Sequence, residues 1–96
     1  MFIVSLHYLV PLTKVDAYIP EHIAFLDEHY AKGHFLLSGR KAPRTGGVIL
    51  ANVDSRDMLD CILVEDPFFR EKLARYEITE IVPGKACAEL GFLLTD

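Results

Sequence analysis

His22 and Asp66 are the side chains best suited to acid–base chemistry. A carboxylate that accepts a hydrogen bond from one imidazole nitrogen fixes the ring tautomer and leaves the other nitrogen free to take a proton from a substrate. The two residues are far apart in sequence, so this chemistry requires a fold that brings them together. Without catalysis, His22 would be a histidine on a helix surface, and Asp66 would be a carboxylate that caps a turn before Pro67. The catalytic and the structural interpretations both stay open.

A cluster of positive charge lies in the segment Arg40–Gly47, which reads as a loop and contains Arg40, Lys41 and Arg44. Guanidinium and backbone N–H groups in such a loop can bind a carboxylate or a phenolate. We therefore take Arg40 and Arg44 as candidate substrate-binding residues, together with Ser38 at the end of the preceding strand. The alternatives are a solvated hairpin loop and a structural serine, since no phosphate-loop or nucleophile-elbow motif is found here.

Neither a metal nor an organic cofactor is expected. A metal site requires three or more convergent ligands, and the trio that we considered is His22, His29 and Asp66. His29 and His34 flank Gly33, and we expect both to be exposed. Cys61 and Cys87 lie outside any CxxC motif, which disfavours a zinc site or a disulfide and fits a reducing cytoplasm.

The overall composition predicts one small globular domain over residues 1–96, with a formal net charge of −4. This acidic balance disfavours a nucleic-acid partner. No apolar run approaches the roughly 18 residues that cross a bilayer, so no membrane partner is expected. The first ten residues read as a strand and not as a signal peptide. A small-molecule substrate is the expected partner.

The elements that must position the candidate residues follow from hydrophobic periodicity. Alternation or continuous β-rich sequence predicts the strands Phe2–Val10, His34–Gly39, Val48–Val53 and Leu73–Val82. A first helix is predicted over Asp16–Lys32, with Asp16 as its cap or with a later start near Pro20, and Gly33 ends it in a left-handed conformation.

Two apolar patterns characterise the helices. In the first helix, one stripe consists of Ile19, Ile23, Leu26 and Tyr30. Asp54 is predicted to cap the second helix, whose apolar stripe consists of Met58, Leu59, Ile62 and Leu63. Asp66 then suits the cap of a short turn that starts at Pro67.

The resulting order, β-α-β-β-α-β, predicts an α+β fold: a ferredoxin-like sandwich with a four-stranded antiparallel sheet and two helices on one face. The other face of the sheet also carries apolar residues, and a second copy stacked against it would keep them from water. A homodimer is therefore expected. Residues 84–96 form a C-terminal extension, for which a short extra strand and a tail are the expectation.

Five short stretches resemble the YciI-like, or YCII-related, family of small bacterial proteins. They occur in the order of the family and span most of the chain. The stretches are Pro20-Glu21-His22-Ile23, Leu37-Ser38-Gly39, Pro43-Arg44-Thr45-Gly46-Gly47-Val48-Ile49, Glu65-Asp66-Pro67-Phe68 and Tyr76-Glu77-Ile78.

The resemblance implies a dimeric α/β-barrel assembly of ferredoxin-like subunits, with His22 and Asp66 as the active-site pair. One characterised member of the family is similar to a dehydrochlorinase that acts on a chlorinated hydroxyhydroquinone without metal or organic cofactor. The sequence departs from its relatives after Gly39, where Arg40 stands in place of a frequent proline. This departure bears on the shape of the loop and on substrate preference.

Two classes of function follow. The first is a cofactor-independent enzyme that uses His22 and Asp66 for proton transfer, isomerisation or HX elimination on a small oxygenated substrate, aromatic substrates included. The second is a non-catalytic module that binds a small molecule or a protein, because the same fold supports unrelated functions. A closed apolar pocket with His22 in its wall favours the enzyme, and a shallow solvated surface favours the binding module.

Overall fold

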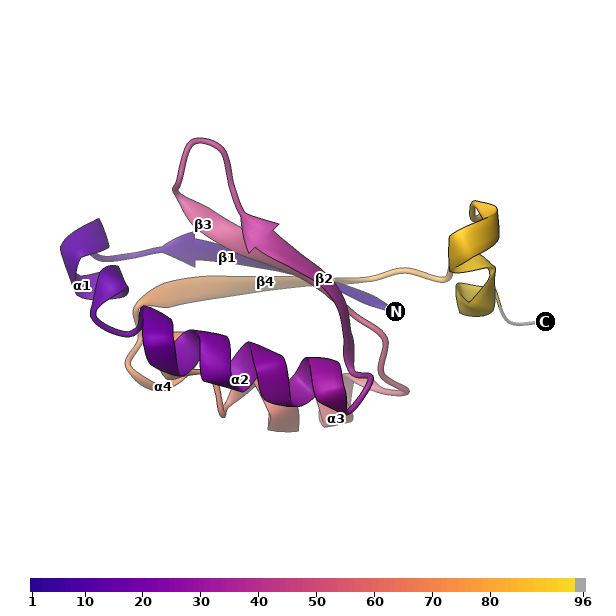
Figure 1. Cartoon of the computed structure of the whole chain (residues 1–96), viewed down its shortest axis with the longest axis horizontal. Helices are drawn as coiled ribbons and strands as arrows, with labels where there is room; N and C mark the ends of the chain where they lie inside the picture. Colours follow the sequence, from indigo (N-terminus) through magenta and orange to yellow (C-terminus); the bar gives the residue numbers. More distant parts are fainter. Residues whose placement is uncertain (95–96) are drawn as a thin grey trace.

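The computed structural model describes residues 1–94, which form a four-stranded antiparallel sheet with helices on one face (Figure 1). The strands are β1 (Phe2–Tyr8), β2 (Phe35–Arg40), β3 (Gly46–Ala51) and β4 (Ala74–Glu80), in the spatial order β2-β3-β1-β4. This is the ferredoxin-like arrangement that the sequence predicts. Each strand lies within two residues of its predicted ends.

The core lies between the sheet and the helices α2 (Ile19–Ala31), α3 (Arg56–Leu63) and α4 (Pro67–Arg70). Alternate residues of β1 face it, so Phe2, Val4 and Leu6 are buried. The main contributions from the helices are Phe25, Leu59, Ile62, Leu63 and Phe68.

The start of the first long helix differs from one of the two predicted alternatives. Asp16 ends a separate short helix, α1 (Leu12–Asp16), and α2 begins at Ile19 with Pro20 in its first turn. Proline is tolerated there because the first N–H groups of a helix have no partner within it. Gly33 has the predicted positive φ, 79°, just after the helix end.

The apolar stripe of α2 packs only partly against the core, through Ile19 and Leu26. Ile23 is 49% exposed and Tyr30 is 38% exposed, while Phe25 and His29 are buried. Ile19, Ile23 and Leu26 also line a pocket between α2 and the sheet. The helix therefore turns one apolar face to the core and a second one to the pocket.

The sequence predicts the N-cap residues of α3 and α4, and one of the two caps is a different residue in the structure. Ser55 caps α3 in place of Asp54, because its side chain accepts a hydrogen bond from the Met58 N–H at 3.1 Å. Asp66 caps α4, as expected, by accepting from the Phe68 N–H.

A close approach near the β2–β3 hairpin requires a glycine. A Cβ atom on Gly46 would lie 1.8 Å from the Leu6 carbonyl oxygen, so no larger residue fits against β1. The contact places the hairpin loop beside the end of β1, where the Tyr8 N–H donates to the Thr45 carbonyl at 2.9 Å.

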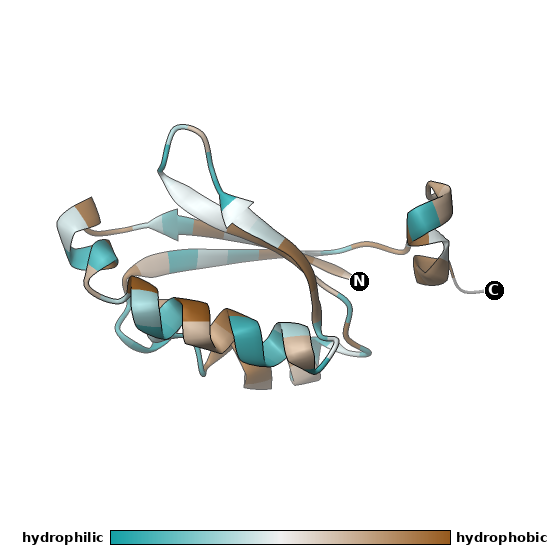
Figure 2. Cartoon of the chain, viewed as in Figure 1, coloured by the Kyte–Doolittle hydropathy of each residue, from teal (hydrophilic) through white to brown (hydrophobic). Residues whose placement is uncertain are grey.

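The C-terminal extension differs from its expectation. Within the described part of residues 84–96 the chain forms a 3-10 helix, η1 (Ala88–Leu93), in place of the short strand. Figure 2 shows that η1 carries apolar residues and stands apart from the sheet and helices. The part of the tail at 95–96 lies outside the described residues. None of the helices described in residues 1–94 has the length and apolar character needed to span a membrane.

Candidate active site

His22 and Asp66 meet in the folded chain. His22 lies in the first turn of α2, Asp66 is the N-cap residue of α4, and His22 Nδ1 is 2.9 Å from Asp66 Oδ1. An ion pair on the surface joins the same two helices, since Arg70 Nη1 lies 2.6 Å from Glu21 Oε2. The sequence alone suggested the contact between His22 and Asp66 but could not establish it.

Three hydrogen-bond donors surround the Asp66 carboxylate, whose side chain is 0% exposed. Oδ1 accepts from His22 and from the Phe68 N–H at 3.0 Å, and Oδ2 accepts from the Tyr76 hydroxyl at 2.5 Å. Burial, and then the negative charge of Asp66, raise the pKa of Tyr76, so this hydroxyl keeps its proton and donates. These three donors satisfy the buried carboxylate from both of its oxygens.

The partners of the carboxylate assign the tautomer of His22. Because an ionised Asp66 can only accept, His22 Nδ1 must carry the hydrogen, and Nε2 of the neutral ring carries the lone pair. The ring stacks on Phe68 with a centroid distance of 4.1 Å and an interplanar angle of 7°. Its side chain is 14% exposed. The ring is therefore held in place, with a free nitrogen available for proton transfer.

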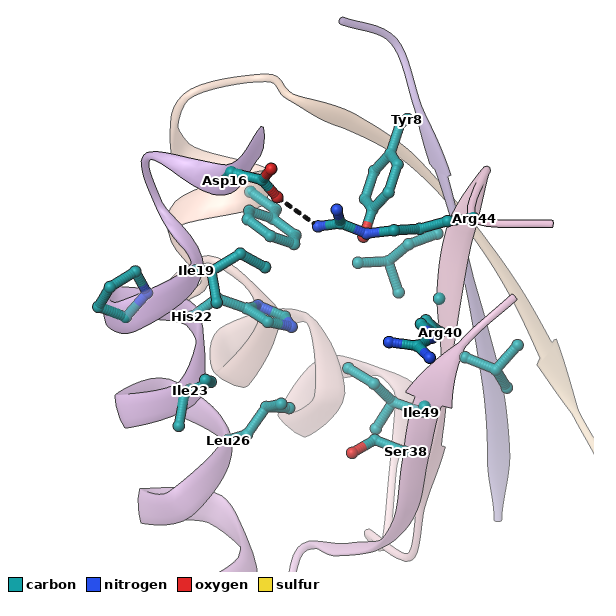
Figure 3. A pocket seen from close by; sticks show the side chains of 16 residues that line it. Tyr8, Asp16, Ile19, His22, Ile23, Leu26, Ser38, Arg40, Arg44 and Ile49 are labelled. Atoms are coloured by element: carbon teal, nitrogen blue, oxygen red, sulfur yellow. Dashed lines mark hydrogen bonds and ion pairs between the residues drawn. The ribbon is translucent and has the colours of Figure 1, made fainter. Parts of the chain in front are cut away.

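His22 forms part of the wall of a pocket of about 720 Å³ between α2 and the strands β1, β2 and β3 (Figure 3). This volume is in the range typical of small-molecule sites. One wall is the apolar stripe of α2, and the opposite wall is polar at the level of Arg40 and Arg44. The lining residues are Leu6, Tyr8, Asp16, Ile19, Pro20, His22, Ile23, Leu26, Ser38, Gly39, Arg40, Arg44, Gly47, Val48, Ile49 and Phe68.

The pocket brings together the other candidate residues of the sequence. Ser38, Arg40 and Arg44 all line it, while Asp66 lies behind His22. The Ser38 Oγ is 2.7 Å from the Tyr30 hydroxyl, which supports the structural interpretation of this serine. Within residues 1–94 Arg40 makes no ion pair.

Two residues that line the pocket were missed from the sequence, in addition to Tyr76, which bonds to Asp66. Asp16 accepts a hydrogen bond from Arg44 at 2.5 Å across the pocket, and this bond is the main reason that the pKa of Arg44 is raised (Figure 3). Tyr8 lines the pocket next to Arg44. No local signal identifies either residue, because both roles depend on contacts between distant segments.

The trio His22, His29 and Asp66 does not converge. His29 binds Glu65 and not Asp66, with its Nε2 2.9 Å from Glu65 Oε1. The expectation that His29 is exposed is also wrong, because its ring is 2% exposed, and His34 is half-buried beside it. Among residues 1–94 the one group of three metal-ligating side chains with converging atoms is Glu28, His29 and Glu65.

The comparisons with known proteins agree with the resemblance read from the sequence. The model of the YCII-related domain matches residues 1–83. The chain belongs to the YCII-related family. The match ends where the C-terminal extension begins, so η1 lies outside the family domain. Among curated proteins, none matches this YCII-related chain.

One similar solved structure is 5-chloro-2-hydroxyhydroquinone dehydrochlorinase from Burkholderia phenoliruptrix AC1100, in complex with 2,5-dihydroxybenzoquinone. The two chains are 18% identical and superpose with a TM-score of 0.66, over 84% of this chain and 93% of the other. At this identity the likeness establishes a shared fold.

Proposed function

We propose that this YCII-related protein is an enzyme that performs general acid–base chemistry on a small oxygenated substrate, without a metal or organic cofactor. The observation that carries the proposal is the His22–Asp66 pair in the pocket wall, with His22 Nδ1 bonded to a buried carboxylate. A histidine that is bonded to a buried carboxylate in the wall of an apolar pocket is an arrangement typical of acid–base active sites.

His22 Nε2 acts as the base in this proposal. It takes a proton from a C–H or O–H group of the substrate, and the imidazolium that forms is stabilised by Asp66, which keeps its charge and does not take the proton. In an isomerisation, Nε2 returns the proton to another atom of the substrate. In an HX elimination, the electron pair of the broken C–H or O–H bond forms a double bond within the substrate. The bond from carbon to X breaks at the same time, and X leaves as the halide ion.

The arginines of the pocket stabilise negative charge on the substrate. Arg40 and Arg44 lie across the pocket from α2, where they face an oxygen that becomes an enolate or a phenolate during proton transfer (Figure 3). Arg44 is shared with Asp16, whereas Arg40 is free for this contact among residues 1–94. The apolar stripe of α2 suits a flat ring, so oxygenated aromatic compounds are the favoured substrate class.

The ligand and substrate of the dehydrochlorinase provide the probes for a test. We would measure chloride release from 5-chloro-2-hydroxyhydroquinone and binding of 2,5-dihydroxybenzoquinone, with the wild type and with His22→Gln. The expected result is chloride release that falls about 10²–10⁴-fold in the variant, the usual contribution of a general base. Asp27→Asn, on the exposed side of the same helix, is the matched control and keeps full activity.

Equal rates for the wild type and His22→Gln would refute the role of His22. If the wild type binds the quinone but releases no chloride, elimination from this substrate is excluded and the second function, a small-molecule-binding module, takes its place. A binding module could also bind a protein, and the exposed apolar residues of the extension favour this kind of partner. They are Leu90, Phe92 and Leu94.

We also propose a homodimer formed by the face of the sheet opposite the helices. Register places Leu50 beside both Ile3 and Leu37 on that face, and Leu37 is 61% exposed. Leu37→Asp is expected to shift the molar mass measured by light scattering from dimer to monomer. Val64→Asp is the control, because Val64 is 53% exposed but follows α3 on the helical side. A monomeric wild type contradicts the proposal.

The compartment that we propose is the cytoplasm. Cys61 and Cys87 are both free and exposed, and reducing conditions keep such residues as thiols.

A further inference from the structure

A second group of titratable side chains lies near the C-terminal end of α2, away from the pocket. Glu28 and His29 belong to α2, and Glu65 follows α3. His29 Nε2 lies 2.9 Å from Glu65 Oε1 and 3.3 Å from Glu28 Oε2. The histidine ring is 2% exposed, while both carboxylates are about half exposed, at 51% and 48%. A buried ring thus turns one nitrogen toward two carboxylates at the surface.

Two carboxylates share one nitrogen of His29. A single N–H group points to one acceptor well, yet two carboxylates converge on Nε2. The neighbouring cation is Lys32, whose Nζ is 3.9 Å from Glu28 Oε2 and whose side chain is 54% exposed. Two carboxylate oxygens that converge on one ring nitrogen form a set of ligand atoms that a divalent cation can bind.

The distances fit a metal ion at that point. Zinc binds histidine nitrogen and carboxylate oxygen at about 2.0–2.2 Å, which places the ligand atoms of a tetrahedral site about 3.3 Å apart. Nitrogen-to-oxygen separations of 2.9 and 3.3 Å already match this geometry, and all three ligand atoms lie within 4.8 Å of one another. The half-exposed carboxylates leave the remaining corner open to water.

His34 supplies the outer contact that a metal-binding histidine usually has. Its Nδ1 lies 3.0 Å from His29 Nδ1. In the neutral metal-free pair, His29 carries its hydrogen on Nε2 and His34 donates from Nδ1. When a metal replaces the hydrogen on Nε2, His29 Nδ1–H donates to His34 Nδ1, and His34 carries its hydrogen on Nε2. Each ring keeps one hydrogen, so the hydrogen bond between His29 and His34 can form both without and with the metal.

We propose that Glu28, His29 and Glu65 bind a divalent transition-metal ion of the zinc type, with water as a further ligand and His34 as the partner of the histidine. None of these residues lines the pocket, so the ion is structural and takes no direct part in the proposed acid–base chemistry. It joins the end of α2 to the segment that carries Asp66, the residue next to Glu65. Metal binding thereby holds the helix and the catalytic carboxylate in one arrangement.

The test is a titration of the EDTA-treated protein with Zn²⁺, followed by calorimetry and by ¹⁵N NMR of the histidine side chains. Because His29 is buried, its replacement risks the fold, and the variants are Glu28→Gln and Glu65→Gln. Each is expected to weaken Zn²⁺ binding at least tenfold, the lower end of the loss seen when metal-site contacts are removed. Glu77→Gln, an exposed position on β4, is the control and binds as the wild type does.

The NMR signals separate this site from adventitious binding at the exposed cysteines Cys61 and Cys87. The expected result is a shift of the His29 Nε2 resonance on saturation, with hydrogen on Nδ1, together with a Zn²⁺-dependent rise in Tm that both glutamine variants reduce. An unchanged His29 spectrum in the presence of Zn²⁺, or wild-type affinity in Glu65→Gln, would overturn the proposal.

Discussion

Two histidine–carboxylate pairs join α2 to the segment between α3 and α4, and they differ in what remains free. His22 and His29 lie about two helical turns apart and bind the consecutive residues Asp66 and Glu65. Asp66 is fully buried with three donors, and His22 keeps one nitrogen free in the pocket wall. Glu65 is half exposed, and both nitrogens of His29 are occupied, one of them by His34.

The difference shows that a histidine–carboxylate contact does not by itself make a catalytic pair. A base needs an ionised partner that fixes its tautomer, and it needs a free nitrogen next to space for a substrate. His22 meets both conditions, whereas His29 has no free nitrogen, because Glu65 and His34 are bonded to its two ring nitrogens. The pairs thus divide two tasks: one pair performs the proposed chemistry and the other anchors the helix that carries it.

The largest effect is expected for Asp66→Asn. The carbonyl oxygen of asparagine can take the place of Oδ1, which accepts from His22 and from the Phe68 N–H, but the negative charge that stabilises the imidazolium is lost and the base is weakened. The kcat for chloride release should fall about 10²–10⁴-fold. Glu65→Gln is the matched change in the other pair and should leave kcat within about twofold. Comparable losses in the two variants would abolish the distinction between the pairs.

Tyr76→Phe comes next, with a loss of about 1–3 kcal/mol in the free energy of unfolding, because it leaves the buried Asp66 Oδ2 without its donor. The pKa of Tyr76 is raised in the folded state, so its stabilising contribution is present below the unfolded value of 10.0 and is lost as pH rises above it. Urea denaturation at neutral pH and above pH 10 measures both effects. A variant that matches the wild type at both pH values contradicts this account of Asp66.

A smaller loss of stability is expected for Glu65→Gln in metal-free protein. The carboxylate is half exposed, and exposed ion pairs contribute about 0.2–1 kcal/mol. The loss should therefore be smaller than that of Tyr76→Phe when both are measured by urea denaturation. A larger loss would show that the surface pair, and not the buried one, dominates the attachment of α2.

The smallest effect is expected for Asp16→Asn, which releases Arg44 from its ion pair across the pocket. Binding of the anionic form of 2,5-dihydroxybenzoquinone should tighten about two- to fivefold, as the loss of one exposed ion pair implies. Calorimetry measures the Kd, and the His29 pair is unaffected. Weaker binding in the variant would mean that Asp16 itself holds the ligand or shapes the pocket.

The sequence predicts the parts of this molecule that depend on local order. Alternation in Phe2–Tyr8 and the cap at Asp66 were both read correctly, because they need only near neighbours. The burial of His29 could not be predicted, since its partner Glu65 is 36 residues away and the flanking Glu28 is polar. The sequence also shows the apolar stripe of α2. Its position in the pocket wall could not be predicted, because α2 turns one apolar face to the core and another to the pocket.

The candidate site divides in the same way. His22, Asp66, Ser38, Arg40 and Arg44 were named as candidates from the sequence, and the structure gathers them around one pocket. Asp16 and Tyr76 were not, because the former was assigned to a helix cap and the latter to strand alternation. Both act through side chains that meet Arg44 and Asp66 only after the sheet and helices have packed.

The tautomer of His22 tests the central claim most directly. Long-range ¹H–¹⁵N NMR of the neutral ring, in the wild type and in Asp66→Asn, shows which nitrogen carries the hydrogen. The account predicts hydrogen on Nδ1 in the wild type, and also in the variant, whose amide oxygen still accepts from His22 and from the Phe68 N–H. Hydrogen on Nε2 in the wild type would contradict it, because His22 would then have no free lone pair facing the pocket.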